Sequence, residues 1–208
     1  MNRALGIAVL TALFGCSGKA TAGDPTRAAA PLATGQAEAV FAGGCFWCME
    51  GPFDKVGGVL STESGYTGGP EDGATYAEVS AGKTGHYEAL RVVYDPTVVT
   101  YAALLEVFWH NIDPTQADGQ FCDRGTQYRS GIFTSDPDEK SKAEASRSKA
   151  AATLNATVVT EILPSATFWL AEDYHQDFYL KNPTHYTRYR TGCGRDARLS
   201  ELWGGSGH

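Results

Sequence analysis

The sequence is short of positive charge, with 17 lysines and arginines against 24 aspartates and glutamates, which gives a formal net charge of -7. Its lysines and arginines form no basic stripe, so the composition argues against a nucleic-acid-binding protein. No internal repeat and no sign of a second domain is found either. What is present is ordinary for a soluble globular protein: 208 residues, 42% hydrophobic and 20% charged, enough for one domain with a sizeable core.

The first residues are typical of an export signal. Arg3 precedes an apolar run at 4–14, which is too short to span a bilayer but suits a signal-peptide core. Residues 20–22 (Ala-Thr-Ala) form a conventional cleavage site, whereas the segment that ends at Cys16 resembles a bacterial lipoprotein box. We therefore expect residues 1–22 to be a signal peptide. The protein would be exported by a bacterium, as a periplasmic protein or as a lipoprotein anchored through Cys16.

The rest of the chain divides into a linker, one domain and a tail. Residues 23–37 are rich in Ala, Thr, Pro and Gly and lack periodicity, which is typical of a flexible tether. Residues 38–203 form the expected folded domain. The glycine-rich end, 204–208, is expected to be a frayed tail.

Hydrophobic periodicity predicts an α+β fold. Strands are predicted at 38–43, 59–66, 87–94, 127–134 and 157–163, and helices at 46–56, 100–112, 136–152 and 173–180. Thr100 and Asp136 are the expected N-caps of the second and third helices. The first six elements follow the order of a ferredoxin-like split βαβ two-layer sandwich, with an open antiparallel or mixed sheet and its helices on one face. An extra C-terminal helix, a strand and a long loop would follow.

Cysteine placement points to thiol chemistry. Besides Cys16 the chain has Cys45, Cys48, Cys122 and Cys193. Four thiols in an exported protein could form two structural disulfides, although a domain of this size does not need them. Cys45 follows a predicted strand and two glycines, at a turn into a helix whose backbone N–H groups and dipole favour a thiolate. We therefore expect Cys45 to be a nucleophile of lowered pKa.

The aromatic residues after Cys45 have two interpretations. Phe46 and Trp47 are either core residues, as most aromatics after a strand are, or an apolar cradle for a methyl group beside the nucleophile. The sequence from Gly43 to Glu50 resembles the Gly-Cys-Phe-Trp signature of the A-type peptide-methionine sulfoxide reductases. Further similarity to that family lies, in family order, at 64–69, 85–88, 125–130 and 172–176.

This resemblance, which covers about Phe41 to Trp203, implies an enzyme that reduces methionine S-sulfoxide, free or in proteins, to methionine. It implies no cofactor, and thioredoxin or another dithiol as the reductant. We also expect a monomer. Several site residues are carried over from the family: Cys45 as catalytic cysteine, Phe46 and Trp47 around the substrate methyl group, Glu88 beside the sulfoxide oxygen, Tyr76 and Tyr128 as its partners, and Asp123 and His175 near the substrate.

The chemistry of a sulfoxide is consistent with the role implied for Glu88. The sulfoxide oxygen becomes basic as a thiolate attacks its sulfur, so a protonated carboxyl and phenol hydroxyls would stabilise it. Burial in an aromatic pocket would raise the pKa of Glu88 enough to keep it protonated.

A sulfenic acid on Cys45 needs a second thiol to resolve it, and two candidates remain. Cys193 lies between two glycines, which allow movement, and it resembles the recycling cysteine of the family, so we place it first. Cys48 could form a CxxC disulfide without loop movement, although many family members have glycine at this position. Cys122 is predicted to be a small buried hydrophobic residue.

Two other functions compete with the reductase. A general thiol–disulfide oxidoreductase could use Cys45 and Cys48 as a CxxC pair, although this motif alone is a weak signal. A metal-binding or disulfide-stapled module is disfavoured because no second CxxC or HxxxH completes a zinc set, so no metal site is predicted.

Overall fold

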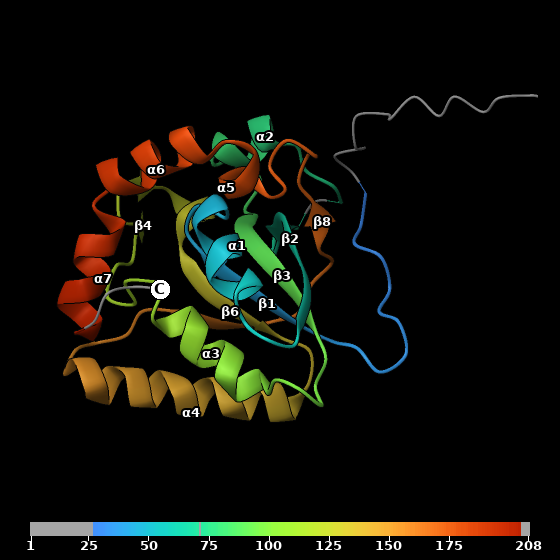
Figure 1. The fold of residues 1–208 in the computed structure, drawn as a ribbon, viewed down its shortest axis with the longest axis horizontal. Coiled ribbons are helices and arrows are strands. Elements are labelled where there is room, and N and C mark those ends of the chain that lie inside the picture. Colours follow the sequence, from blue (N-terminus) through green and yellow to red (C-terminus); the bar gives the residue numbers. More distant parts are fainter. Residues whose placement is uncertain (1–26, 71, 205–208) are drawn as a thin grey trace, which may run out of the picture.

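A computed structural model describes residues 27–70 and 72–204 (Figure 1). The strands are β1 (Ala37–Gly43), β2 (Val59–Thr67), β3 (Tyr87–Tyr94), β4 (Gly119–Gln120), β5 (Asp123–Arg124), β6 (Ser130–Thr134), β7 (Glu161–Pro164) and β8 (Trp169–Leu170). The helices are α1 (Trp47–Asp54), α2 (Tyr76–Ser80), α3 (Tyr101–Trp109), α4 (Pro137–Leu154), α5 (Phe178–Lys181), α6 (Pro183–Gly192) and α7 (Arg195–Trp203). A 3-10 turn, η1, spans Thr126–Tyr128.

The main sheet confirms the predicted topology. Within the described residues its strand order is β7-β6-β1-β3-β2-β8. The central four strands alternate in direction, and β7 alone runs parallel to its neighbour β6, which makes the sheet mixed. The order β6-β1-β3-β2 is that of a split βαβ fold, in which each helix crosses over to bring a later strand beside an earlier one.

The core lies between the sheet and three helices. Phe41, Leu90 and Ile132 lie on adjacent strands and form one buried cluster with side chains of α1, α3 and α4. Their chain neighbours point to the opposite face, because successive strand residues alternate sides. That second face is covered by irregular segments around Ala29 and Phe168, whose backbones are hydrogen-bonded at 2.9 Å. Within the described residues, the helices α1, α3 and α4 cover this first face, as predicted (Figure 1).

Local sequence signals set several element boundaries correctly. The side chain of Thr100 accepts a hydrogen bond from Ala103 N, and that of Asp136 accepts from two backbone N–H groups, so both predicted N-caps form. Strand β3 has the predicted bounds. The strands predicted from 127 and from 157 begin later, at Ser130 and Glu161.

In the C-terminal region the helix predicted at 173–180 is shorter and begins later, as α5, and the helices α6 and α7 replace the expected long loop. Asn182-Pro183 ends α5 as expected, but Pro183 also opens α6, since proline is well suited to the first position of a helix. Gly194, at φ 66°, then provides the left-handed residue between α6 and α7.

A proline inside α1 links this C-terminal region to the first helix. Pro52 has no N–H with which to bond the carbonyl of Cys48, four residues earlier. That carbonyl accepts a hydrogen bond from Arg190 Nη1 of α6 at 3.3 Å instead. The helix therefore continues through Gly51-Pro52, and α6 is bound to it.

The predicted signal peptide, including Cys16, lies outside the described residues. Part of the predicted tether is described: Ala28 forms an antiparallel β-bridge with Trp169 of β8. Among residues 27–70 and 72–204, no helix combines the length and the apolar character needed to cross a membrane.

Candidate active site

The ends of three strands place predicted site residues at one edge of the sheet. Because β1 is antiparallel to both β3 and β6, the end of β1 meets the beginnings of the other two. Cys45 follows β1, Glu88 is the second residue of β3, and Tyr128 lies just before β6. Residues more than eighty positions apart in sequence thus reach a common pocket.

The turn that carries Cys45 requires its two glycines. A Cβ on Gly44, which has φ +80°, would lie 2.5 Å from Gln120 Cβ, and one on Gly43 would lie 2.4 Å from Met49 Sδ. The carbonyl of Gly43 accepts a hydrogen bond from the buried guanidinium of Arg195 at 2.9 Å. The backbone of β1 can therefore pack closely on its surroundings as it turns into α1.

The pKa values of the two cysteine thiols in this turn are shifted in opposite directions. Cys45 and Cys48 are 6% and 1% exposed and free of disulfide bonds, and their thiols hydrogen-bond to each other. Burial, the bond to Cys48 and the nearby Glu88 raise the pKa of the Cys45 thiol. The hydrogen bond from Cys45, with the charges of Arg195 and Arg190, lowers the pKa of Cys48 to about 6.

The expectation of a lowered pKa at Cys45 is therefore wrong for the resting pocket. Desolvation outweighs the helix dipole here, and the nearest N–H of the helix start is not available to the sulfur. Phe46 N donates instead to Glu88 Oε2 at 3.2 Å. Burial and its neighbours thus favour the thiol form of Cys45, whereas the charges of Arg195 and Arg190 favour the thiolate form of Cys48.

Glu88 is a buried acid with one hydrogen-bond partner among the described residues. It is 1% exposed, and its Oε2 accepts only the backbone N–H of Phe46 among the hydrogen bonds of the described residues. Burial raises the pKa of this carboxyl to about 8. Glu88 is therefore mostly protonated at neutrality and can donate a proton to a ligand.

Two tyrosines lie around the same acid. Burial and the charges of Glu88 and Cys45 raise the pKa of Tyr76 to about 12. The pKa of Tyr128 is raised by burial and by Glu88, Tyr76 and Cys45. Both hydroxyls therefore stay protonated, next to the same acid and thiol.

An aromatic wall stands beside the thiol. Trp47 stacks on Phe178 with ring centroids 3.7 Å apart, and its Nε1 donates to His175 Nδ1 at 2.9 Å. This bond leaves the proton of the neutral imidazole on Nε2, and burial lowers the pKa of His175 to about 4. The ring of Phe46 lies 5.0 Å from that of His175. The predicted substrate-binding residues Phe46, Trp47 and His175 thus form one wall.

Asp123, the remaining predicted residue, has a partner that the sequence did not suggest. Its Oδ2 accepts a hydrogen bond of 2.5 Å from the hydroxyl of Tyr189, on α6. The same hydroxyl acts on the Cys45 thiol, whose pKa it lowers while burial, Cys48 and Glu88 raise it. Tyr189 lies outside the family-like motifs, and the helix that carries it was not predicted.

Comparison with known proteins identifies the family. Residues 37–206 match the family described as peptide methionine sulfoxide reductase. The chain belongs to the peptide methionine sulfoxide reductase family. It is 54% identical over 168 residues to peptide methionine sulfoxide reductase MsrA 2 of Caulobacter vibrioides, covering 80% of this chain and 85% of that one. With MsrA of Bacillus subtilis the identity is 51%, covering 80% of this chain and 95% of the relative.

Solved structures show the same fold. Reduced Mxr1 of Saccharomyces cerevisiae matches with a TM-score of 0.69 and 31% identity, covering 72% of this chain and 87% of that one. Methionine sulfoxide reductase A of Corynebacterium diphtheriae matches with a TM-score of 0.66 and 37% identity, covering 73% and 77%. The chain is accordingly an oxidoreductase that reduces methionine sulfoxide through redox-active cysteines, as the sequence resemblance implied.

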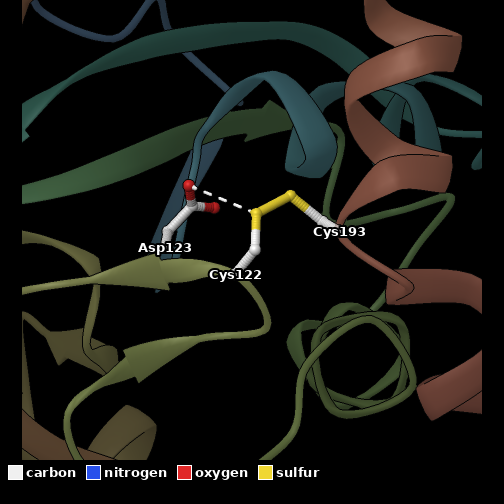
Figure 2. Close-up of side chains that lie close together, drawn as sticks. All are labelled: Cys122, Asp123 and Cys193. Carbon is white, nitrogen blue, oxygen red and sulfur yellow. Dashed lines mark hydrogen bonds between the residues drawn. A yellow bond between two sulfur atoms is a disulfide. The ribbon is translucent and has the colours of Figure 1, made fainter.

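The other two cysteines of this reductase are bonded to each other. Cys122 and Cys193 form a disulfide with a Cα–Cα distance of 4.9 Å (Figure 2). Cys122 is exposed, so its prediction as a buried hydrophobic residue is wrong. It follows β4 on a surface turn where its sulfur meets the loop between α6 and α7.

The same corner holds a possible metal-ligand group. The Asp123 carboxylate and the two sulfurs lie within 4.8 Å of one another (Figure 2). Because the sulfurs are bonded to each other, neither is a thiolate that could bind a metal in this state. In the oxidised reductase the cluster is therefore a cross-link rather than a metal centre.

This cross-link should stabilise the reductase. It joins residues separated by 71 positions, so the Cys122→Ser, Cys193→Ser double variant should lose about 2–4 kcal/mol of unfolding free energy. Urea unfolding followed by circular dichroism would measure the loss. Wild type unfolded with a reductant should match the variant; equal stability of variant and oxidised wild type would show that the disulfide contributes nothing.

Proposed function

We propose that Cys45 takes the oxygen from methionine S-sulfoxide, free or in proteins, and that Cys48 resolves the resulting sulfenic acid. The observation that supports this most is the pairing of a buried thiol with a buried, protonated carboxyl, Cys45 with Glu88, beside an aromatic wall. The preference for the S epimer rests on the family resemblance.

The aromatic wall would hold the substrate by its methyl group. Phe46 and Trp47 present ring surfaces next to Cys45, and Trp47 is held from behind by Phe178 and at its edge by His175. A methyl on a polarised sulfur packs well on such rings. This fixes the sulfoxide sulfur close to the nucleophile.

The acid and the tyrosines would act on the oxygen. As Cys45 attacks sulfur, the sulfoxide oxygen gains negative charge and takes a proton from Glu88, while the hydroxyls of Tyr76 and Tyr128 donate hydrogen bonds to it. The methionine sulfur gains two electrons, and the oxygen remains on Cys45 as a sulfenic acid. Methionine leaves as the thioether.

Cys48 is placed to resolve that sulfenic acid. Its backbone N–H donates to the carbonyl of Cys45 at 3.1 Å, and its pKa, lowered to about 6, favours the thiolate form. Cys193, our first candidate from the sequence, is bonded to Cys122 and is not free to attack until that disulfide is reduced. Displacement of hydroxide from Cys45 by Cys48 then gives a buried disulfide and, with a proton, water.

A thioredoxin-like dithiol would complete the cycle. The Cys45–Cys48 pair is buried, whereas the Cys122–Cys193 disulfide reaches the surface. We propose that the reductant acts at the surface pair, whose thiols then reduce the inner pair by thiol–disulfide exchange.

We also propose export by a bacterium, with Ala-Thr-Ala cleavage at 20–22 or lipid attachment at Cys16, and a monomer without nucleic-acid partners. The apolar run at 4–14 supports export, and the net charge of -7 argues against nucleic-acid partners. The mass of the mature protein distinguishes the two processing sites.

Disulfide mapping after one turnover tests the choice of resolving cysteine. Wild type, mixed with one equivalent of methionine sulfoxide and no reductant, should yield a peptide linked through Cys45 and Cys48, with Cys122–Cys193 unchanged. The Cys48→Ser variant should release its methionine equally but form no such link. A Cys45–Cys193 link in the wild type would assign resolution to Cys193 instead.

A further inference from the structure

The surface corner around the disulfide changes its chemistry when the disulfide is reduced. In the oxidised reductase the sulfurs of Cys122 and Cys193 are bonded, and a carboxylate oxygen of Asp123 lies within 4.8 Å of both (Figure 2). The proposed recycling by a dithiol breaks this bond and leaves two thiols beside the carboxylate. Two thiolates and a carboxylate are ligands of the kinds that bind zinc.

Contacts other than the disulfide hold the two cysteine segments together. Arg195, two residues after Cys193, is 1% exposed and donates to the carbonyl of Gly43 at 2.9 Å. Its guanidinium also lies 4.4 Å from the ring centre of Phe121, the residue before Cys122. Because these contacts do not involve sulfur, the two cysteines should stay side by side after reduction.

The carboxylate is also held in place. Asp123 pairs with Gln120 across the β4–β5 hairpin, and its Oδ2 accepts a hydrogen bond from the Tyr189 hydroxyl at 2.5 Å. Its Oδ1 faces the sulfur of Cys122 at 3.9 Å (Figure 2). Proteins commonly orient a metal-binding carboxylate by a hydrogen bond to its second oxygen, which is the arrangement found here.

The corner has room for the small opening that a metal ion requires. Zinc bound at about 2.3 Å from each sulfur places the two sulfurs roughly 3.8 Å apart in tetrahedral geometry. The Cα atoms of the two cysteines are 4.9 Å apart, so side-chain rotation can provide most of this separation. Gly192 and Gly194, on either side of Cys193, have open space around them for the rest. Cys122 is exposed, so water can reach the fourth position.

We propose that the reduced enzyme binds one zinc ion through Cys122 Sγ, Cys193 Sγ and Asp123 Oδ1, with water as the fourth ligand. In this step two S–H bonds break, two Zn–S bonds form and two protons pass to solvent, while no electron moves. The preceding reduction transfers two electrons and two protons from the dithiol, which becomes a disulfide. The opening of the site therefore rests on the proposed recycling reaction.

The chemistry of the ligands selects zinc. Thiolates favour zinc over calcium and magnesium, which take oxygen ligands. Three anionic ligands and one zinc ion leave a single negative charge. The buried Arg195, which lies over Phe121 and has no carboxylate partner in the part of the chain that the structure describes, offsets this charge.

Bound zinc would stop recycling without stopping oxygen transfer. Sulfurs held by the metal are not free to exchange with the reductant or with the inner pair, Cys45 and Cys48. The first oxygen transfer to Cys45 does not use the outer pair. Zinc at this corner would thus act as a brake that is available only while the outer pair is reduced.

Calorimetric titration with zinc chloride tests the site directly. The Cys45→Ser, Cys48→Ser double variant removes the inner CxxC pair as a competing zinc site. Reduced with a phosphine and then freed of reductant without oxygen, it should bind one zinc ion per chain with a Kd below about 1 μM. The same protein before reduction should bind none at this affinity. Zinc-edge X-ray absorption should show two sulfur neighbours at about 2.3 Å.

Variants in this background separate the ligands from their surroundings. Asp123→Asn, which removes a ligand, should weaken zinc binding about a hundredfold, and Tyr189→Phe, which removes only the orienting hydrogen bond, about tenfold. The matched control is Asp118→Asn, since this carboxylate lies in the same turn but pairs with Arg124 at 2.6 Å, outside the cluster. It should leave the Kd unchanged.

A reduced double variant that binds zinc more weakly than about 1 μM, or equally well after Asp123→Asn, would overturn the proposal. If the double variant does not fold, the reduced wild type should bind one zinc ion more than Cys122→Ser, and equal binding by the two would overturn it.

The activity of zinc-loaded enzyme distinguishes this proposal from the function itself. One equivalent of zinc on reduced wild type should leave the methionine released in the first turnover unchanged. It should slow thioredoxin-supported turnover at least about tenfold. Equal turnover with and without bound zinc would contradict the brake. Failure to release methionine without zinc would instead contradict the proposed function.

Discussion

Replacing Cys45 with serine should abolish reduction of methionine sulfoxide, with a loss of at least about a thousandfold in kcat. A serine hydroxyl is far less nucleophilic toward sulfur than a thiolate, and it cannot form the sulfenic acid that holds the transferred oxygen. Release of methionine, measured with dithiothreitol as the reductant, gives the rate.

The control for this variant is Cys122→Ser. It removes a sulfur that the proposed chemistry does not need when dithiothreitol is the reductant, so most of the dithiothreitol-supported activity should remain. Because Cys45 is buried and serine is slightly smaller, circular dichroism should confirm that Cys45→Ser is folded. A folded Cys45→Ser variant that still reduced sulfoxide would place the nucleophile elsewhere.

Replacing Glu88 with glutamine should lower kcat about a hundredfold to ten-thousandfold, the usual contribution of a general acid. The amide keeps the shape of the side chain, and its oxygen can still accept the hydrogen bond from Phe46 N. It has no acidic proton to transfer to the sulfoxide oxygen. Binding of the sulfoxide should change much less than kcat, because the methyl group is held by Phe46 and Trp47 rather than by the acid.

The pH dependence provides a second test of Glu88. Its pKa is raised to about 8, so the protonated, active form is present at neutral pH and is lost as the pH rises through about 8. The kcat of wild type should therefore fall on the alkaline side of 8, and Glu88→Gln should lack that fall. Glu50→Gln is the matched control, since Glu50 is buried on α1 and bonded to Ser64 outside the pocket, and it should keep the wild-type profile. The same fall in Glu88→Gln would assign it to another group.

Much of the fold followed from local patterns. The run Tyr87–Tyr94 predicted β3, and Asp95-Pro96 ends it, a signal that does not depend on the rest of the chain. The caps at Thr100 and Asp136 are equally local. The order of these elements then allowed few topologies, and the split βαβ arrangement was one of them.

Most of the site depended on the family motifs rather than on physical pattern. By its own sequence context Glu88 is an acid at the start of a strand, and nothing nearby indicates that it is buried. Its burial arises because β1, β3 and β6 bring distant residues together at one edge of the sheet. Only the structure gives the desolvation that keeps it protonated.

The errors have the same origin. The acidity of Cys45 was misjudged because helix position is visible in a sequence, whereas burial and the neighbouring Cys48 and Glu88 are not. Tyr189 was missed because α6 has little apolar periodicity and is held by tertiary bonds such as that from Arg190 to Cys48. The pairing of Cys122 with Cys193 joins segments 71 positions apart, and no spacing rule predicts it.

The formation of a sulfenic acid at Cys45 is tested most directly by trapping it. The Cys48→Ser variant, with Cys122–Cys193 intact, should react with one equivalent of methionine sulfoxide in the presence of dimedone and no reductant. Mass spectrometry should then find the dimedone adduct on the peptide that contains Cys45, in an amount equal to the methionine released. Methionine release with the adduct on another cysteine, or with none, would contradict oxygen transfer to Cys45.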